Sequence, residues 1–108
     1  MELRVNVRPG RYRVPDVVLI DRSLTREEII THPPSLCVEV LSPEYRISET
    51  DERLADYFQM GVPCVWIFDP VRRKAFLRTG STSTEVTGTI RMPGTPIELA
   101  LDDVFAES

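Results

Sequence analysis

The chain has 108 residues, so we expect a single domain over residues 1–108 with one hydrophobic core. Its composition, 42% hydrophobic and 28% charged, is that of an ordinary soluble protein. No apolar run approaches the roughly 20 residues that cross a bilayer, and no signal-peptide pattern is present, so we expect a cytoplasmic protein without a membrane partner. The net charge of −4 argues against a protein that only coats nucleic acid, because such proteins are usually basic.

The first third of the sequence indicates strands separated by turns. Residues 3–8 alternate apolar and polar side chains, which is typical of a half-buried strand, and a Pro-Gly turn follows. Residues 11–21 then indicate a second strand, in which residues 17–20 are expected to be buried on both faces. A capping-box spacing predicts a short helix over residues 25–30.

A central helix is expected between two buried strands. Residues 36–41 and 62–68 are apolar runs, and the segment between them has a helical pattern from about Ser48 to Gly61. This connection is long enough for a crossover, which allows the two strands to be parallel. The pattern therefore predicts an α/β fold with a mixed sheet and one main crossover helix. The other expected elements are antiparallel strands at residues 75–78 and 82–91, and a segment at 97–101 that leads into a short helix near 102–105.

Two cysteines, Cys37 and Cys64, lie in apolar strand-like runs. They do not form a Cys-x-x-Cys pair, so a disulfide or a structural metal site is not expected. We expect both to behave as small buried hydrophobic residues.

Two carboxylates, Asp16 and Glu39, occur within strand-like apolar runs. A buried carboxylate is costly unless it pairs with a cation or binds a metal. Carboxylates on neighbouring strands would suit Mg²⁺, which prefers oxygen ligands and keeps several water molecules. The structural alternative is that Asp16 ends a strand in a turn while Glu39 faces solvent. The spacing alone leaves both interpretations open.

Four sequence blocks follow one another along the chain: Pro15-Asp16-Val17-Val18, Leu36-Cys37-Val38-Glu39-Val40-Leu41-Ser42-Pro43, Arg53-Leu54-Ala55-Asp56-Tyr57 leading to Gly61-Val62-Pro63, and Val65-Trp66-Ile67-Phe68-Asp69-Pro70. The order of the last three is specific, whereas Pro15-Asp16 by itself is not. This pattern resembles the bacterial restriction endonuclease-like family of the PD-(D/E)xK nuclease superfamily, from about residue 13 to the C-terminus. The resemblance implies a restriction-endonuclease-like core, with Asp16 and Glu39 as ligands of Mg²⁺ or Mn²⁺. It also implies hydrolysis of nucleic acid, with DNA as the expected substrate.

The sequence departs from the family pattern at the cation. The superfamily's Glu-x-Lys position is Leu41 here, and the resemblance implies that the family's lysine lies on the following helix, where this chain has Arg53. Arginine keeps the positive charge but cannot give up its proton, so it cannot act as a general base. Lys74, the only lysine, lies in a turn and is a poor substitute.

Two hypotheses for function follow from this substitution. If the lysine only orients water and stabilises charge, Asp16, Glu39 and Arg53 form the catalytic set of a metal-dependent nuclease. If the lysine must lose its proton, the chain is a catalytically inactive, dimeric nuclease-fold module with a binding or regulatory role. Relatives usually carry a further N-terminal helical region, so we also expect a shortened member whose uncovered sheet face favours a homodimer.

Four arginines crowd the first hairpin, and they are candidates for weak contacts with a nucleic-acid backbone. The alternative is a solvated polar face on an edge hairpin. Tyr57 and Trp66 are expected to pack in the core, although the Tyr57 hydroxyl could reach the acidic pair. Asp69 is expected to stabilise the turn at Pro70, and His32 to lie in a loop. The four arginines are Arg4, Arg8, Arg11 and Arg13.

Overall fold

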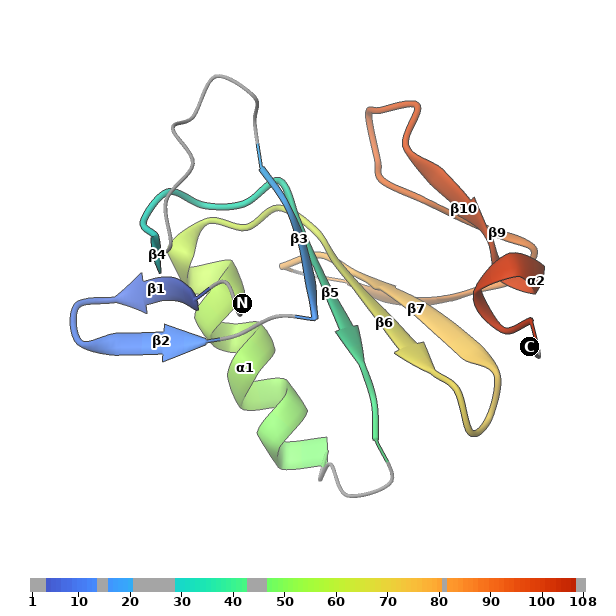
Figure 1. Cartoon of the computed structure of the whole chain (residues 1–108), viewed down its shortest axis with the longest axis horizontal. Helices are drawn as coiled ribbons and strands as arrows, with labels where there is room; N and C mark the ends of the chain where they lie inside the picture. The colour runs from blue at the N-terminus through green and yellow to red at the C-terminus, as the bar shows by residue number, and fades with distance from the viewer. Residues whose placement is uncertain (1–3, 14–15, 21–28, 43–46, 81, 107–108) are drawn as a thin grey trace.

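A five-stranded mixed sheet, in the order β3-β5-β6-β7-β8, forms the centre of the computed structural model (Figure 1). The structure describes residues 4–13, 16–20, 29–42, 47–80 and 82–106. The strands of this sheet are β3 (Val17–Leu19), β5 (Leu36–Val40), β6 (Val65–Asp69), β7 (Lys74–Arg78) and β8 (Ser83–Val86).

Helix α1 (Ile47–Met60) crosses from β5 to β6, the one parallel pair in this sheet. Glu39 on β5 pairs in register with Ile67 on β6. The pairs β3–β5, β6–β7 and β7–β8 are antiparallel. The predicted fold class, an α/β fold with a mixed sheet, one main crossover helix and antiparallel hairpins, is therefore confirmed.

Glycine at position 61 ends α1 and turns the chain into β6. The Gly61 N–H donates to the carbonyl of Phe58, and the Val62 N–H donates to the carbonyl of Tyr57. This pair of bonds forms a Schellman-type cap, which needs a residue with positive φ after the helix. Gly61 has φ +112°, and a Cβ at this position would lie 3.3 Å from Cγ of Pro33. Backbone conformation and close packing therefore both favour glycine here.

Hydrophobic clusters lie on both faces of the central sheet. Cys37, Val65 and Ile67 face α1, where they pack with Leu54 and Tyr57. The alternating positions on β5 and β6 point to the other face, because side chains of a strand alternate between its two sides. That second cluster comprises Leu36, Val38, Cys64, Trp66, Phe68, Ala75, Ile90, Met92 and Leu101.

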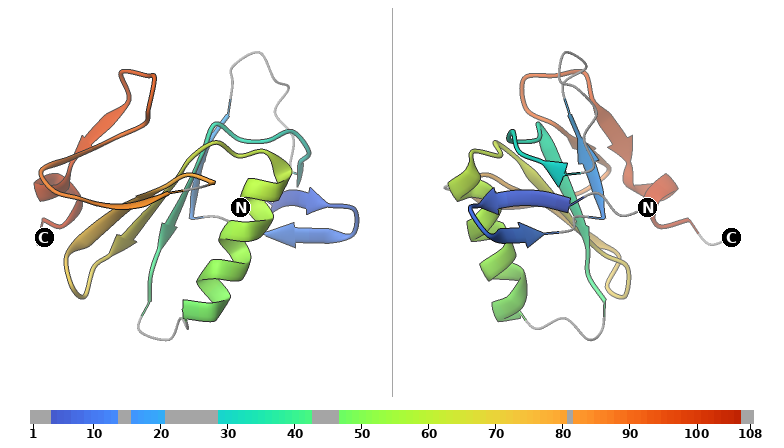
Figure 2. Two further views of the ribbon diagram at one scale, coloured as in Figure 1. Left: turned by 180° about the vertical axis from the view of Figure 1, so that it is seen from behind. Right: turned by 60° about the vertical axis from the view of Figure 1, so that its left-hand side comes forward.

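A C-terminal hairpin and a short helix cover the second face (Figures 1 and 2). The hairpin strands are β9 (Thr89–Arg91) and β10 (Glu98–Ala100), and α2 (Leu101–Val104) follows. Trp66 is 2% exposed and makes an edge-on contact with Phe68, so its predicted place in the core is confirmed.

A second, smaller sheet packs on α1. It has the order β2-β1-β4, formed by β1 (Arg4–Arg8), β2 (Arg11–Arg13) and β4 (Ile29–Ile30). Val5 and Val7 of β1 are buried in the cluster that contains Leu54 and Tyr57. The first hairpin is thus attached to the helix that carries Arg53, on one side of the central sheet (Figure 2).

Three predicted elements differ from the structure. The expected strand over 11–21 is divided into β2 and β3, which belong to different sheets, and Val17 is 52% exposed rather than buried on both faces. Of the helix expected at 25–30, residues 29–30 form β4 by pairing with β1, and the others lie outside the described residues. The expected strand over 82–91 is divided at Gly88, whose φ of +78° turns the chain from β8 into β9.

Both cysteines are free and buried, as predicted. Burial, together with the nearby charge of Glu39 and the Cys64 thiol, raises the pKa of Cys37 to about 12, and burial raises that of Cys64 to about 11. Both thiols therefore stay protonated near neutral pH and act as small apolar groups. In the part of the chain that the structure describes, no helix has the length and apolar character needed to cross a membrane.

Candidate functional site

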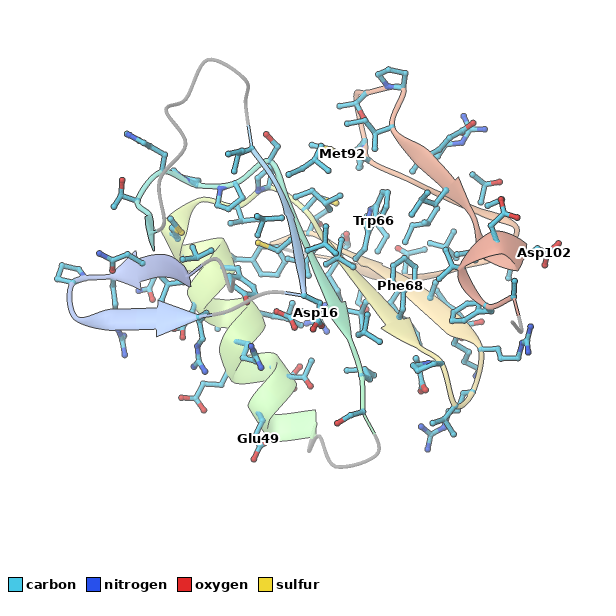
Figure 3. The ribbon with its side chains drawn as sticks, viewed as in Figure 1. Asp16, Glu49, Trp66, Phe68, Met92 and Asp102 are labelled. Atoms are coloured by element: carbon cyan, nitrogen blue, oxygen red, sulfur yellow. The ribbon has the colours of Figure 1, made fainter. Side chains whose placement is uncertain are left out.

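The register between β3 and β5 brings Asp16 and Glu39 together. Val17 pairs with Val38, and the Asp16 N–H donates to the Val38 carbonyl at 3.1 Å. Asp16 thus lies just before the first paired residue of β3, where its backbone bonds to the residue that precedes Glu39. Burial raises the pKa of Glu39 and the charge of Asp16 raises it further, so the two carboxylates lie close enough to interact. Figure 3 shows Asp16 at the start of β3.

The Asp16 carboxylate is held against the end of β5. Its Oδ2 accepts a hydrogen bond from the Val40 N–H at 2.7 Å, and the residue is exposed. This bond fixes one oxygen next to the residue that follows Glu39. Asp16 therefore presents a partly oriented carboxylate at the solvent-facing side of the pair.

Glu39 is the buried member of the pair, with 5% of its surface exposed. The alternative interpretation, in which Glu39 faces solvent, is therefore wrong. Its Oε1 accepts a hydrogen bond of 2.6 Å from the Tyr57 hydroxyl and lies 3.9 Å from Nε of Arg53. Arg53 and Tyr57 are four residues apart on α1, so they lie on the same side of the helix.

Arg53 therefore reaches back from the helix to the strand that carries Glu39, as its helical position predicts. Its side chain is 18% exposed, so its charge is only partly screened by solvent. Lys74 lies 3.5 Å from Glu85, across the β7–β8 pair. The cation beside the acidic pair is thus an arginine.

Burial, reinforced by the charge of Asp16, raises the pKa of Glu39 above its ordinary value. The Tyr57 hydrogen bond and the charges of Arg53 and Arg13 act in the opposite direction, but they do not fully offset the burial. Burial and the hydrogen bond to Glu39 also raise the pKa of Tyr57, which keeps its hydroxyl protonated as a donor. The surroundings of Glu39 thus disfavour its ionised form when no further cation is bound.

Replacing Tyr57 with phenylalanine tests this hydrogen bond. The Tyr57→Phe protein should show a higher Glu39 pKa, because the donor that favours the ionised carboxylate is gone. Its free energy of unfolding should fall by about 1–3 kcal/mol, the usual cost of an unsatisfied buried group. Carboxyl carbon NMR titration reads the pKa, and urea unfolding reads the stability. An unchanged Glu39 titration in a folded variant would contradict the assignment.

Arg13 attaches the first hairpin to α1 near Glu39. Its Nε and Nη2 each lie 2.9 Å from Oδ2 of Asp56, and Nη2 lies 3.7 Å from Oε1 of Glu52. Arg13 is thus directed toward the helix, while Arg8 is exposed on the same hairpin. The side chains of Arg4 and Arg11 lie outside the described part of the structure. A nucleic-acid contact by this hairpin stays a prediction.

Asp56 was not singled out from the sequence, although it is buried and holds Arg13. The sequence signal for Asp56 is its place on the helix. It is next to Tyr57, which is expected in the core, and it follows Glu52 by four residues, so one cation can reach both acids. Asp69 behaves as predicted and accepts hydrogen bonds from the backbone N–H groups of Val71 and Arg72. Although its burial opposes ionisation, the hydrogen bonds and charge of Arg72 lower the Asp69 pKa overall.

The donor set fits a hydrated magnesium or manganese ion. Oδ2 of Asp16 and Oε1 of Glu39 each accept a hydrogen bond from the protein. The second oxygen of each carboxylate is therefore a candidate metal ligand. Within the described residues, no group of three or more His, Cys, Asp or Glu side chains could enclose a metal. A site with two carboxylates suits Mg²⁺, which usually retains several waters and binds one or two carboxylates together with substrate phosphates.

The mixed sheet, the crossover helix and the carboxylate pair define a protein with a nuclease-like α/β fold. The chain belongs to the Uma2 family, described as "Putative restriction endonuclease", whose model matches residues 1–101.

The crystal structure of a "putative nuclease belonging to DUF820" from Anabaena variabilis is similar, with a TM-score of 0.76 and 18% sequence identity. The superposition covers 98% of this chain and 66% of that protein, so this chain spans about two thirds of its length. At this identity the likeness establishes the shared fold. A comparison with curated proteins finds no match.

Proposed function

We propose that this protein is a metal-dependent nuclease that hydrolyses phosphodiester bonds in nucleic acid, with DNA as the substrate. The observation that supports the proposal best is the approach of Arg53 to Glu39, at 3.9 Å, next to the charge of Asp16. Membership of a restriction endonuclease-like family supports the same reaction class.

Asp16 and Glu39 would hold the metal through the carboxylate oxygens that do not accept the Val40 and Tyr57 hydrogen bonds. A bound Mg²⁺ or Mn²⁺ would supply Lewis acidity toward the phosphate and a lowered pKa for water. Tyr57 orients the Glu39 carboxylate, and the Val40 N–H orients that of Asp16. The protein thereby presets both ligands before the ion and the substrate arrive.

Arg53 would stabilise negative charge on the phosphate in the transition state. Its guanidinium is permanently charged and presents several donors in a planar fork that matches phosphate oxygens. It cannot take a proton from the attacking water, since it has no acceptor. In this proposal Arg53 acts through its charge alone. Deprotonation of the attacking water would then depend on the acidic pair and the metal ion.

The first hairpin would contribute to substrate binding. Its strand β1 packs on α1, the helix that carries Arg53, and Arg4, Arg8 and Arg11 all lie on this hairpin. Arginines that follow a nucleic-acid backbone give affinity without sequence selectivity, and such affinity weakens as salt is added. This local charge offsets the acidic balance of the whole chain.

Two substitutions at Asp16 test the proposal. The wild-type protein should nick supercoiled plasmid in Mn²⁺, and both Asp16→Asn and Asp16→Ala should lose at least about 100-fold of this activity, since each removes a metal ligand. The asparagine variant is the sharper one, because its amide oxygen can still accept the Val40 hydrogen bond. Its melting temperature should therefore match that of the wild type.

Calorimetric titration with Mn²⁺ separates the remaining outcomes. Metal binding that depends on Asp16, without cleavage of any substrate, would favour the catalytically inactive binding module, and light scattering would then test whether it is a homodimer. Metal affinity that is unchanged in Asp16→Asn would overturn the metal assignment for either function.

A further inference from the structure

A groove runs between α1 and the strands β6, β7 and β8, beyond the acidic pair. It consists of two adjoining hollows with volumes of about 620 and 430 Å³, which share Asp51, Arg78 and Ser83 in their walls. The larger hollow has the size of sites that hold a small organic ligand. The proposed hydrolysis does not itself use this space.

The groove begins next to the proposed catalytic residues. Ile67 lines it and is the register partner of Glu39 across β5 and β6. Leu41, which also lines it, lies two residues beyond Glu39 and therefore continues the same face of the chain. A ligand strand held by Asp16 and Glu39 could thus extend directly into the groove.

The inner wall of the groove is apolar. Ile67 is 4% exposed, and Leu41 and Phe76 are half-buried against the cluster under α1. Phe76 provides an aromatic ring, on which a planar base can stack whatever its sequence. Thr50 and Ser83 add hydroxyl groups that can donate or accept hydrogen bonds.

The charges around the groove are balanced. Arg78 lies 3.8 Å from Asp51, and Arg72 donates to Asp69 while remaining 72% exposed. Two cations and two anions leave little net attraction for a phosphate inside the groove. An uncharged ring with a hydrogen-bonding edge suits this lining better, with its phosphates left outside near the arginines.

We propose that this groove receives an unpaired nucleotide of the nucleic-acid substrate. The base would lie on Leu41, Ile67 and Phe76, while Arg78 would contact the adjoining backbone. The inference rests on the proposed function and makes it more specific. It implies that single-stranded, frayed or mismatched nucleic acid binds better than a fully paired duplex, because a paired base must first leave its stack.

Binding without cleavage tests the proposal. In metal-free protein kept in chelator, which prevents hydrolysis, fluorescence anisotropy would compare a labelled single strand with its own duplex. We expect Arg78→Gln and Phe76→Leu each to weaken single-strand binding by at least about fivefold, as expected when a stacking or backbone contact is lost. Arg91→Gln is the matched control, since Arg91 is also ion-paired, at 3.0 Å from Glu98, but lies on the C-terminal hairpin.

A base analogue gives an independent reading. The fluorescence of a strand that contains 2-aminopurine should be quenched on binding, and Phe76→Leu should remove much of this quenching. Thermal melting would show that the variant is folded. Equal effects of Arg78→Gln and Arg91→Gln, equal affinity for strand and duplex, or no binding to any strand would each overturn the groove assignment.

Plasmid cleavage by the wild type is scored separately. Cleavage combined with unaffected groove variants would leave the nuclease proposal standing without the groove. Groove-dependent binding without any cleavage would keep the groove and reject the hydrolysis.

Discussion

Replacing Glu39 with glutamine should remove cleavage by at least about 100-fold and yet make the metal-free protein more stable at neutral pH. Glu39 is buried, and its pKa is raised above the ordinary value of 4.5 mainly by that burial. An ionised carboxylate in this place is therefore costly when no metal is bound. Glutamine removes the charge and can still accept the hydrogen bond from Tyr57 through its amide oxygen.

The effect has a defined pH dependence. Because the folded-state pKa of Glu39 is raised, the folded protein holds this proton more tightly than the unfolded chain does. Wild-type stability should consequently fall as pH rises from about the ordinary value through the folded pKa, and Glu39→Gln should lack this fall. Asp69, with its lowered pKa, should stabilise the folded state equally in both proteins. This stabilisation should be lost as pH falls below the ordinary aspartate pKa of 3.8.

Thermal unfolding across this range, in chelator and then with Mn²⁺, measures the difference. Added Mn²⁺ should stabilise the wild type and not the variant, since only a ligand that binds the folded state raises its stability. A Glu39→Gln protein that is less stable than the wild type at neutral pH without metal would contradict the picture of a buried charge that its neighbours offset only in part.

Replacing Arg53 with alanine should lower cleavage by about 100-fold or more, whereas Arg53→Lys should retain it. The guanidinium Nε lies 3.9 Å from Glu39, so a charge at this place acts on both the carboxylate and a phosphate bound there. Lysine keeps a positive charge on a long side chain, and alanine does not. Plasmid cleavage rates at several Mn²⁺ concentrations separate weaker metal binding from slower hydrolysis, with Arg91→Ala as the control.

The two variants also decide between the functional hypotheses. Full activity in Arg53→Ala would remove Arg53 from the proposed machinery. An inactive wild type together with an active Arg53→Lys variant would mean that the scaffold is intact and that a single residue silences hydrolysis. In that case the requirement is for a cation that can lose its proton, which arginine cannot do.

The centre of the fold was predictable because its signals are local. The apolar runs of β5 and β6, with Gly61 at the end of α1, determine a strand, a crossover helix and a parallel strand. The division of the predicted strand over 11–21 was not predictable, because β2 and β3 pair with partners in different sheets. The same tertiary pairing turned residues 29–30 into a strand beside β1.

For the acidic pair the spacing alone left two interpretations open, and the family resemblance supplied the prediction of a metal site. Asp16 and Glu39 stand out as carboxylates in apolar runs, and their residue types suggest a metal. The bond from Arg13 to Asp56 joins residues 43 positions apart, and it depends on how the first hairpin packs on α1. The Tyr57–Glu39 bond likewise depends on the rotation of α1 against the sheet, which the helical spacing alone does not determine.

The hydrogen bonds that hold Asp16 against β5 have a consequence for how chains of this family can differ in length. Because Asp16 bonds to Val38 and Val40, residues added to the connection between β3 and β5, outside β4, would leave the two carboxylates together. A single residue inserted within β3 or β5 would instead send one carboxylate to the opposite face of the sheet, because side chains alternate with a period of two. The site therefore tolerates insertions in the connection between β3 and β5, but not insertions within either strand.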